Sequence, residues 1–143
     1  MDLFGVFDIS SAGMSVEQSR LAVAASNLAN ARTSAGVDGT AYQPLRAVVQ
    51  ATSYASVEAG IAAESLPRPV VQGVVATQSA PRLVYDPGHP DADERGFVAM
   101  PATDSLHTMM ELISVSRGYE ANLRAFDVTR HLLQSTIDMG NSR

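Results

Sequence analysis

Residues 105–137, SLHTMMELISVSRGYEANLRAFDVTRHLLQSTI, form the stretch that decides the fold. Apolar and aromatic side chains recur along it at alternating steps of three and four residues, which is the spacing of a coiled-coil seam on a helix. Seven of the nine seam positions are apolar or aromatic, and they extend over four heptads. The seam consists of Met109, Leu112, Ser116, Tyr119, Leu123, Phe126, Arg130, Leu133 and Ile137.

This seam predicts one long helix over residues 103–139. Asp104 or Ser105 can cap its start, and Gly140 is expected to stop it. At ~1.5 Å per residue the helix would be about 55 Å long. That length is more than a compact domain of this size needs.

A second helix is predicted over residues 3–31, because residues 14–31 contain neither proline nor glycine. Two apolar lines run along it, each with a seven-residue repeat. The second line is displaced from the first by two residues, so it lies about 200° away around the helix. Two nearly opposite lines predict neighbours on both sides, whereas a surface helix needs only one apolar face. The lines are Phe7, Met14, Leu21 and Leu28, and Ile9, Val16 and Val23.

The middle of the chain, residues 34–102, differs from both ends in composition. It holds all seven prolines together with short β-branched runs. Its length of about 70 residues is near the lower limit for a self-sufficient core, so we expect a small β-rich module tied to the helices. Residues 52–65 are rich in Ala and Ser and fit a loop or a short helix. Strands are predicted within Tyr42–Ser53, Val70–Ser79, Arg82–Tyr85 and Phe97–Ala99.

The predicted fold is therefore mainly α with a small β-rich insert, in which long N- and C-terminal helices pair as a coiled coil. We divide the chain into an N-terminal helix, a small β-rich domain with loops, and a C-terminal helix. These parts span residues 1–33, 34–102 and 103–143.

Composition excludes several classes of function. The net charge is −5 with no lysine, and nucleic-acid binding needs a basic patch. Without cysteine there is no disulfide or thiolate metal site. No apolar run approaches 18 residues, so no membrane span is predicted. Asp2 and Asp8 stand where a cleavable secretory signal needs positive charge.

The acidic stretch 86–96, DPGHPDADERG, is the segment that most resembles a ligand site. A calcium loop starting at Asp91 and Asp93 would place Arg95 at the fifth ligand position and Ala102 at the twelfth. Those positions need oxygen ligands, the twelfth a bidentate Glu, so a calcium loop does not fit. A rigid solvated loop of Pro-Gly and Asx turns is the preferred interpretation.

Other candidate chemistry is equally sparse. His89 and Asp91 form at most half of a metal site, and His107 with Glu111 is expected to be an ion pair one helical turn apart. The sequence contains no Gly-x-Ser-x-Gly elbow and no glycine-rich phosphate loop. We therefore predict no enzyme, no cofactor and no metal. A metal-dependent enzyme using His89, Asp91 and Asp93 is kept as a remote alternative.

Three asparagines and one glycine lie inside or at the ends of the predicted helices. Asn is a weak helix former, and Gly118 costs roughly 1 kcal/mol relative to Ala in a helix interior. One interpretation is tolerated surface residues. The other is that Gly118 allows close approach of another helix, while Asn27, Asn30 and Asn122 fix register across a helix interface.

The same residues carry a resemblance to a known family. Residues 27–33, NLANART, resemble the Asn-x-Ala-Asn-x-x-Thr signature that ends the first helix of flagellar rod and hook axial proteins. Residues 116–122, SRGYEAN, are similar to the Ser-Arg-x-Tyr-x-Ala-Asn signature of the last helix in that family. The central segment is similar to a narrower, proximal-rod branch through Tyr85, Pro87, His89, Pro90, Asp91, Asp93 and Gly96.

The resemblance implies a structural subunit of the bacterial flagellar basal-body rod that polymerises helically through its terminal helices. Its partners would be copies of itself, other rod proteins, neighbouring basal-body components and the flagellar type III export apparatus. It would cross the periplasm after export without a cleaved signal, and a soluble helical adaptor remains the main alternative. The expected pairing and assembly residues are Phe7, Met14, Leu21, Asn27, Leu28, Asn30, Met109, Leu112, Arg117, Tyr119, Asn122, Leu123, Phe126, Leu133 and Ile137.

Overall fold

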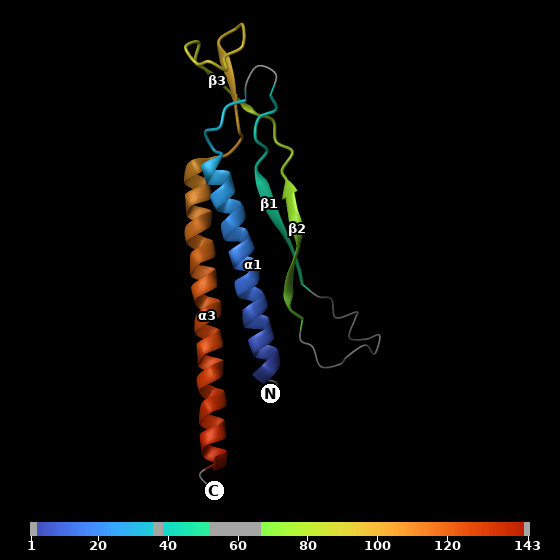
Figure 1. The fold of residues 1–143 in the computed structure, drawn as a ribbon, viewed down its shortest axis with the longest axis vertical. Coiled ribbons are helices and arrows are strands. Elements are labelled where there is room, and N and C mark those ends of the chain that lie inside the picture. The colour runs from blue at the N-terminus through green and yellow to red at the C-terminus, as the bar shows by residue number, and fades with distance from the viewer. Residues whose placement is uncertain (1–2, 36–38, 52–66, 142–143) are drawn as a thin grey trace, which may run out of the picture. The chain divides into compact units, whose positions relative to one another are not determined.

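The computed structural model describes residues 3–35, 39–51 and 67–141, which form two long helices and four strands (Figure 1). Both predicted helices and all four predicted strands are present, with ends shifted by a few residues. The segment 52–65, predicted as loop or short helix, lies outside the described residues. The elements are α1 (Leu3–Ala29), β1 (Leu45–Ala51), β2 (Pro69–Ala76), β3 (Arg82–Tyr85), β4 (Phe97–Met100) and α3 (Ser105–Asn141).

The ends of α3 test the predicted start and stop signals. Asp104 caps the start as predicted, because its Oδ1 accepts a hydrogen bond from the Leu106 amide at 3.0 Å. The predicted stop is wrong, since α3 runs through Gly140 to Asn141. Glycine ends a helix when it adopts the left-handed conformation, and among the described glycines only Gly96 has a positive φ.

The strands form two separate two-stranded sheets, one of β1 with β2 and one of β3 with β4. In the second sheet the strands are antiparallel, and Tyr85 pairs with Phe97 while Leu83 pairs with Ala99. An isolated bridge joins Ala35 to Ala99, so the segment after α1 is attached to the free edge of β4. The insert is therefore a pair of hairpins rather than a closed β-domain.

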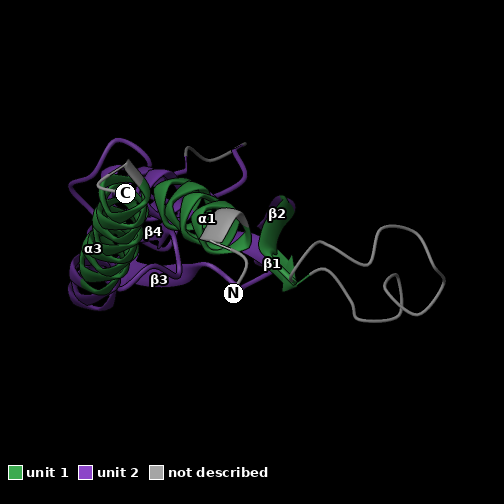
Figure 2. Cartoon of the chain, turned by 90° about the horizontal axis from the view of Figure 1, so that it is seen from below, with its two compact units in different colours: residues 1–19, 49–72, 114–143 green, residues 20–48, 73–113 purple. Residues whose placement is uncertain are grey.

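The chain separates into two compact units, each taking part of both helices (Figure 2). The first unit comprises residues 1–19, 49–72 and 114–143, and the second comprises residues 20–48 and 73–113. Within the first unit, the α1 segment lies between α3 and the ends of β1 and β2 (Figure 2).

Both units bury mainly small side chains, whereas many large apolar side chains are exposed. In the first unit the buried residues include Val16, Val115 and Thr129, and in the second they include Ala24 and Val98. Neither of the described helices is long and apolar enough to cross a membrane.

Candidate assembly surface

Within the first unit, α1 and α3 are in contact and run in opposite directions. The rings of Phe7 and Phe126 meet edge to face with centroids 4.7 Å apart. A Cβ added to Gly13 would lie 2.8 Å from Oδ1 of Asn122, and one added to Gly118 would lie 3.1 Å from Cδ of Glu17. Glycine at both positions therefore allows close helix approach, which favours the second of the two interpretations given for Gly118.

The face of α3 that meets α1 lies next to the predicted seam rather than on it. Val115 and Thr129 are buried, and half-buried Asn122 lies between them at the same seven-residue spacing. The seam line through Tyr119 and Phe126 is displaced by four residues, which is about 40° around the helix. Apart from the Phe7–Phe126 ring pair, the contact with α1 is thus made by smaller side chains.

Part of the seam is consequently exposed. Leu123 and Ile137 on its outer line are 41% and 58% exposed, and Tyr119 on its inner line is 40% exposed. Phe126 and Leu133, also on the inner line, are half-buried. The isolated chain therefore covers only part of its apolar seam, and the role of the seam in an assembly stays a prediction.

The other side of α1 in the first unit faces the start of β2. Arg68 Nη1 lies 3.8 Å from Asp8 Oδ2, which forms a solvent-exposed ion pair across this contact. A groove of about 390 Å³ runs alongside, with Ser11, Ala12 and Ser15 on α1 and Pro69, Val70 and Val71 on β2. Neighbours on two sides of α1 agree with the two apolar lines read from the sequence. We call this feature the α1–β2 groove.

In the second unit, Asn27 joins the end of α1 to the first residue of β1. Its Nδ2 donates to the Leu45 carbonyl at 2.8 Å, and its Oδ1 accepts from the Leu45 amide at 2.8 Å. Tyr42 donates its hydroxyl proton to the same Oδ1 at 3.0 Å. The buried amide therefore acts as a substitute strand partner, satisfying a backbone donor and a backbone acceptor together.

The other two asparagines also bond within the chain. Nδ2 of Asn30 donates to the Ser26 carbonyl at 2.9 Å, which satisfies a group at the C-terminus of α1. Nδ2 of Asn122 donates to the Gly118 carbonyl at 3.1 Å, while the side chain fills the space left by Gly13. Of the three, Asn122 matches the predicted place at a helix interface, whereas Asn27 holds a strand.

The acidic loop between β3 and β4 uses its carboxylates to bind its own backbone. Oδ1 of Asp93 accepts from the amides of Arg95 and Phe97, each at 2.8 Å. Gly96 has φ +79°, and a Cβ there would lie 3.0 Å from the Tyr85 ring. The loop is therefore the network of Asx turns that the sequence favoured.

His89 and Asp91 tie this loop to the segment after α1. Ser34 Oγ donates to Asp91 Oδ2 at 2.5 Å. The Asp91 amide donates to His89 Nδ1 at 3.1 Å, which requires a lone pair on that nitrogen. His89 Nδ1 also lies 3.8 Å from Asp91 Oδ2.

Metal ligation finds no support among the described residues. No group of three or more His, Asp or Glu side chains gathers there. Oδ1 of Asp93 already accepts two amide protons. The ion pair predicted between His107 and Glu111 is not among the ion pairs of the described residues.

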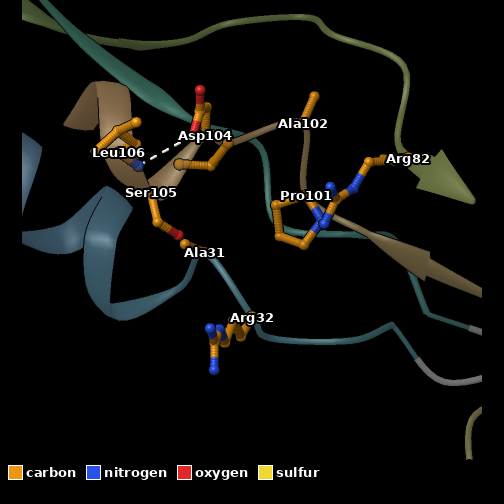
Figure 3. Close-up of a pocket in the computed structure, with 9 residues that line it drawn as sticks. Ala31, Arg32, Arg82, Pro101, Ala102, Asp104, Ser105 and Leu106 are labelled. Atoms are coloured by element: carbon orange, nitrogen blue, oxygen red, sulfur yellow. Dashed lines mark hydrogen bonds between the residues drawn. The ribbon is translucent and has the colours of Figure 1, made fainter. Parts of the chain in front are cut away.

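The second unit has a pocket of about 650 Å³ at the start of α3 (Figure 3). Arg32 and Arg82 line it together with Pro101 and Asp104, whose capping bond to Leu106 is drawn in Figure 3. The Asp104 carboxylate already serves the helix end, so the two guanidinium groups are the remaining charged groups of the lining. The pocket shows no catalytic arrangement.

Sequence reasoning missed three residues that shape these contacts, namely Gly13, Ser34 and Tyr42. No spacing pattern along α1 singles out Gly13. Only its contact with Asn122 in the folded chain distinguishes it. Tyr42 and Ser34 lie in loops, where spacing carries no information about distant partners.

Comparison with known proteins matches both ends of this chain to flagellar families. Residues 7–34 match the family described as "Flagella basal body rod protein". Residues 94–139 match the family described as "Flagellar basal body rod FlgEFG protein C-terminal". These two regions contain most of α1 and of α3 and include the asparagine signatures at residues 27–33 and 116–122.

Curated relatives resemble the chain over nearly its whole length. The flagellar basal-body rod protein FlgC of Escherichia coli O6:H1 is 34% identical over 140 residues, covering 98% of this chain and 99% of the relative. FlgC of Aquifex aeolicus is 36% identical over 142 residues, covering 96% and 97%. FlgC of Bacillus subtilis is 30% identical over 152 residues, covering 98% and 99%.

Proposed function

Because the chain belongs to the FlgC family of flagellar basal-body rod proteins, we propose that it polymerises helically through α1 and α3 into a torque-transmitting shaft. Membership makes it a structural subunit of the basal-body rod and not an enzyme. The proposal concerns how the subunit assembles and what the assembly does.

The observation that carries the proposal is the half-covered seam of α3. Tyr119, Leu123 and Ile137 are exposed on the same long helix whose other face is packed on α1. Fully covering a Leu or Ile side chain contributes about 1.5–3 kcal/mol. Burial of several such side chains at a contact between copies would therefore stabilise their association.

The finer features follow from this seam. We propose that α1 and α3 pair as a coiled coil in the assembled state and that the hairpins between them lie outside the helical layer. Extensive interdigitated packing makes an interior stiff, and stiffness is what torque transmission needs. A contact between two different faces produces a helical polymer when its rotation does not close a ring.

The placement of the polymer is also part of the proposal. The narrower resemblance of residues 85–96 supports a proximal-rod position, and the rod would cross the periplasm. Export through the flagellar type III apparatus, which the family resemblance implies, belongs to the same proposal. Partners would be further copies, other rod proteins and neighbouring basal-body components.

The test is to purify basal bodies from cells that carry an epitope-tagged chain and from cells that lack the gene. We expect the tagged chain in the rod by immunogold imaging and mass spectrometry, and no complete rod in the deletion strain. A tagged chain that remains in the soluble fraction, beside normal rods in the deletion strain, would instead indicate the helical adaptor.

A further inference from the structure

The open edge of the α3 seam and the α1–β2 groove are two unlike surfaces of the first unit. The open edge consists of Tyr119, Leu123 and Ile137, all exposed. It is continuous with the intrachain interface, because Phe126 on the same seam already packs against Phe7. The apolar surface that α1 begins to cover therefore continues outward uncovered.

The α1–β2 groove has the opposite relief. Ser11, Ala12 and Ser15 give it small side chains on one side, while β2 supplies apolar walls that include exposed Val70. Its volume of about 390 Å³ is large enough to receive several large side chains of a helix. A ridge of large residues and a groove lined by small ones are the two halves of a packed helix contact.

We propose that the open seam of one copy packs into the α1–β2 groove of a second copy. This inference rests on the proposed function and names its contact surfaces. A two-fold dimer would place each seam in the partner's groove and leave neither surface for a further copy. A head-to-tail contact instead fills one seam and one groove and leaves one of each for the next copy, so the array can extend as a helix when the rotation does not close a ring.

The direction of the helices agrees with this occupant. Copies lying side by side in the same direction would place a neighbour's α3 antiparallel to α1, as it is within the chain.

Disulfide mapping tests the contact, because the chain has no cysteine of its own. One tagged copy carries Ser15→Cys and a co-expressed copy carries Leu123→Cys. Ser15 lies two residues from both Gly13 and Glu17, which puts it about 160–200° around α1 from the α3 contact. Each copy carries a single cysteine, so a disulfide can join only two different copies.

We expect a cross-linked dimer from purified rods of the mixed strain and none from either single variant. Tyr119→Cys and Ile137→Cys repeat the test at neighbouring positions of the seam, so that a shift in register is detected. Val128→Cys is the matched control, because Val128 is exposed yet lies about 140° around α3 from Leu123. Ser15→Cys with Val128→Cys should give no dimer.

The outcomes separate the two proposals. If rods contain the chain but no seam position cross-links to Ser15→Cys, or if Val128→Cys cross-links equally well, the seam-in-groove contact is overturned and the rod function stands. A dimer from a single-cysteine variant would indicate a two-fold contact and also overturn it. Absence of the chain from rods overturns both.

Discussion

The α1–α3 contact and the acidic loop use their side chains in opposite ways. Along α3, small and polar residues such as Val115 and Thr129 are buried, whereas large ones such as Leu123 and Ile137 are exposed. In the loop at residues 86–96, the Asp93 carboxylate accepts the loop's own amides, and Ser34 secures Asp91. The loop completes its interactions within the chain, and the helix does not.

This difference indicates which region depends on partners. A loop whose hydrogen bonds are satisfied locally keeps the same stabilising interactions in the monomer and in the polymer. A helix pair that leaves its apolar seam half uncovered has only part of its stabilisation before assembly, because most helical stability comes from packing. Each prediction below breaks or sharpens this contrast.

The largest expected effect is in amide exchange of the purified monomer. We expect fast exchange along both α1 and α3 relative to β3, β4 and the loop between them, because local opening is easiest where buried contacts are few. Hydrogen-exchange mass spectrometry on a verified monomer measures this. Slow exchange throughout both helices would show that α1 and α3 are stable in the monomer without partners.

The next effect is on assembly through Phe126→Ala. The change removes the ring packed on Phe7 and an apolar member of the seam, at a cost of about 3–5 kcal/mol if the side chain is fully buried in the polymer. Rods should be lost while secretion of the subunit continues. Motility and rod recovery are the measurements, and exposed Glu94→Ala should be near neutral. Normal rods with Phe126→Ala would show that the seam is not an assembly interface.

The approach of the helices is tested by Gly13→Leu. The new side chain enters space occupied by Asn122, so we expect the free energy of unfolding to fall by roughly 1–3 kcal/mol. The matched control is Gly140→Leu, where a Cβ meets nothing within 4 Å. Thermal melting of the monomer followed by circular dichroism should show reduced helicity for Gly13→Leu alone. Equal behaviour of the two variants would mean that α1 and α3 are not in close contact.

Asn27→Ala tests the attachment of β1. Loss of the side-chain amide leaves the Leu45 amide and carbonyl without this hydrogen-bond partner. We expect the free energy of unfolding to fall by about 1–3 kcal/mol as a result. NMR should show faster exchange of the Leu45 amide proton. Asn30→Ala is the control, since Asn30 bonds only near the end of its own helix. An unchanged Leu45 signal in Asn27→Ala would contradict the substitute-strand role.

The smallest effect on rod assembly is expected in the loop with Asp91→Ala and Asp93→Ala combined. Metal content measured by mass spectrometry should be zero both before and after the change. Local stability should fall by about 1 kcal/mol for each lost hydrogen bond, while Asp93→Asn keeps its Oδ1 acceptor and should be nearly neutral. Stoichiometric calcium or zinc that disappears in the double variant would make the loop a metal site.

Much of the fold could be predicted because its signals are local. The seven-residue repeats through Phe7 and Phe126 indicated both helices, and the Asp104 cap marked where α3 begins. The turn chemistry of Asp93 and Gly96 indicated a self-contained loop. The Gly140 stop failed because glycine only permits a helix to end, and nothing nearby required the left-handed conformation.

By itself, the sequence determined the two long helices, the short strands between them and the asparagine signatures that carry the family. Only the tertiary structure decided which line of α3 meets α1 and which group Asn27 binds. The lines through Asn122 and Tyr119 lie about 40° apart on one helix, so spacing alone cannot choose between them. The choice is made where Gly13 and Gly118 let two backbones approach, and that is a property of the pair of helices rather than of either one.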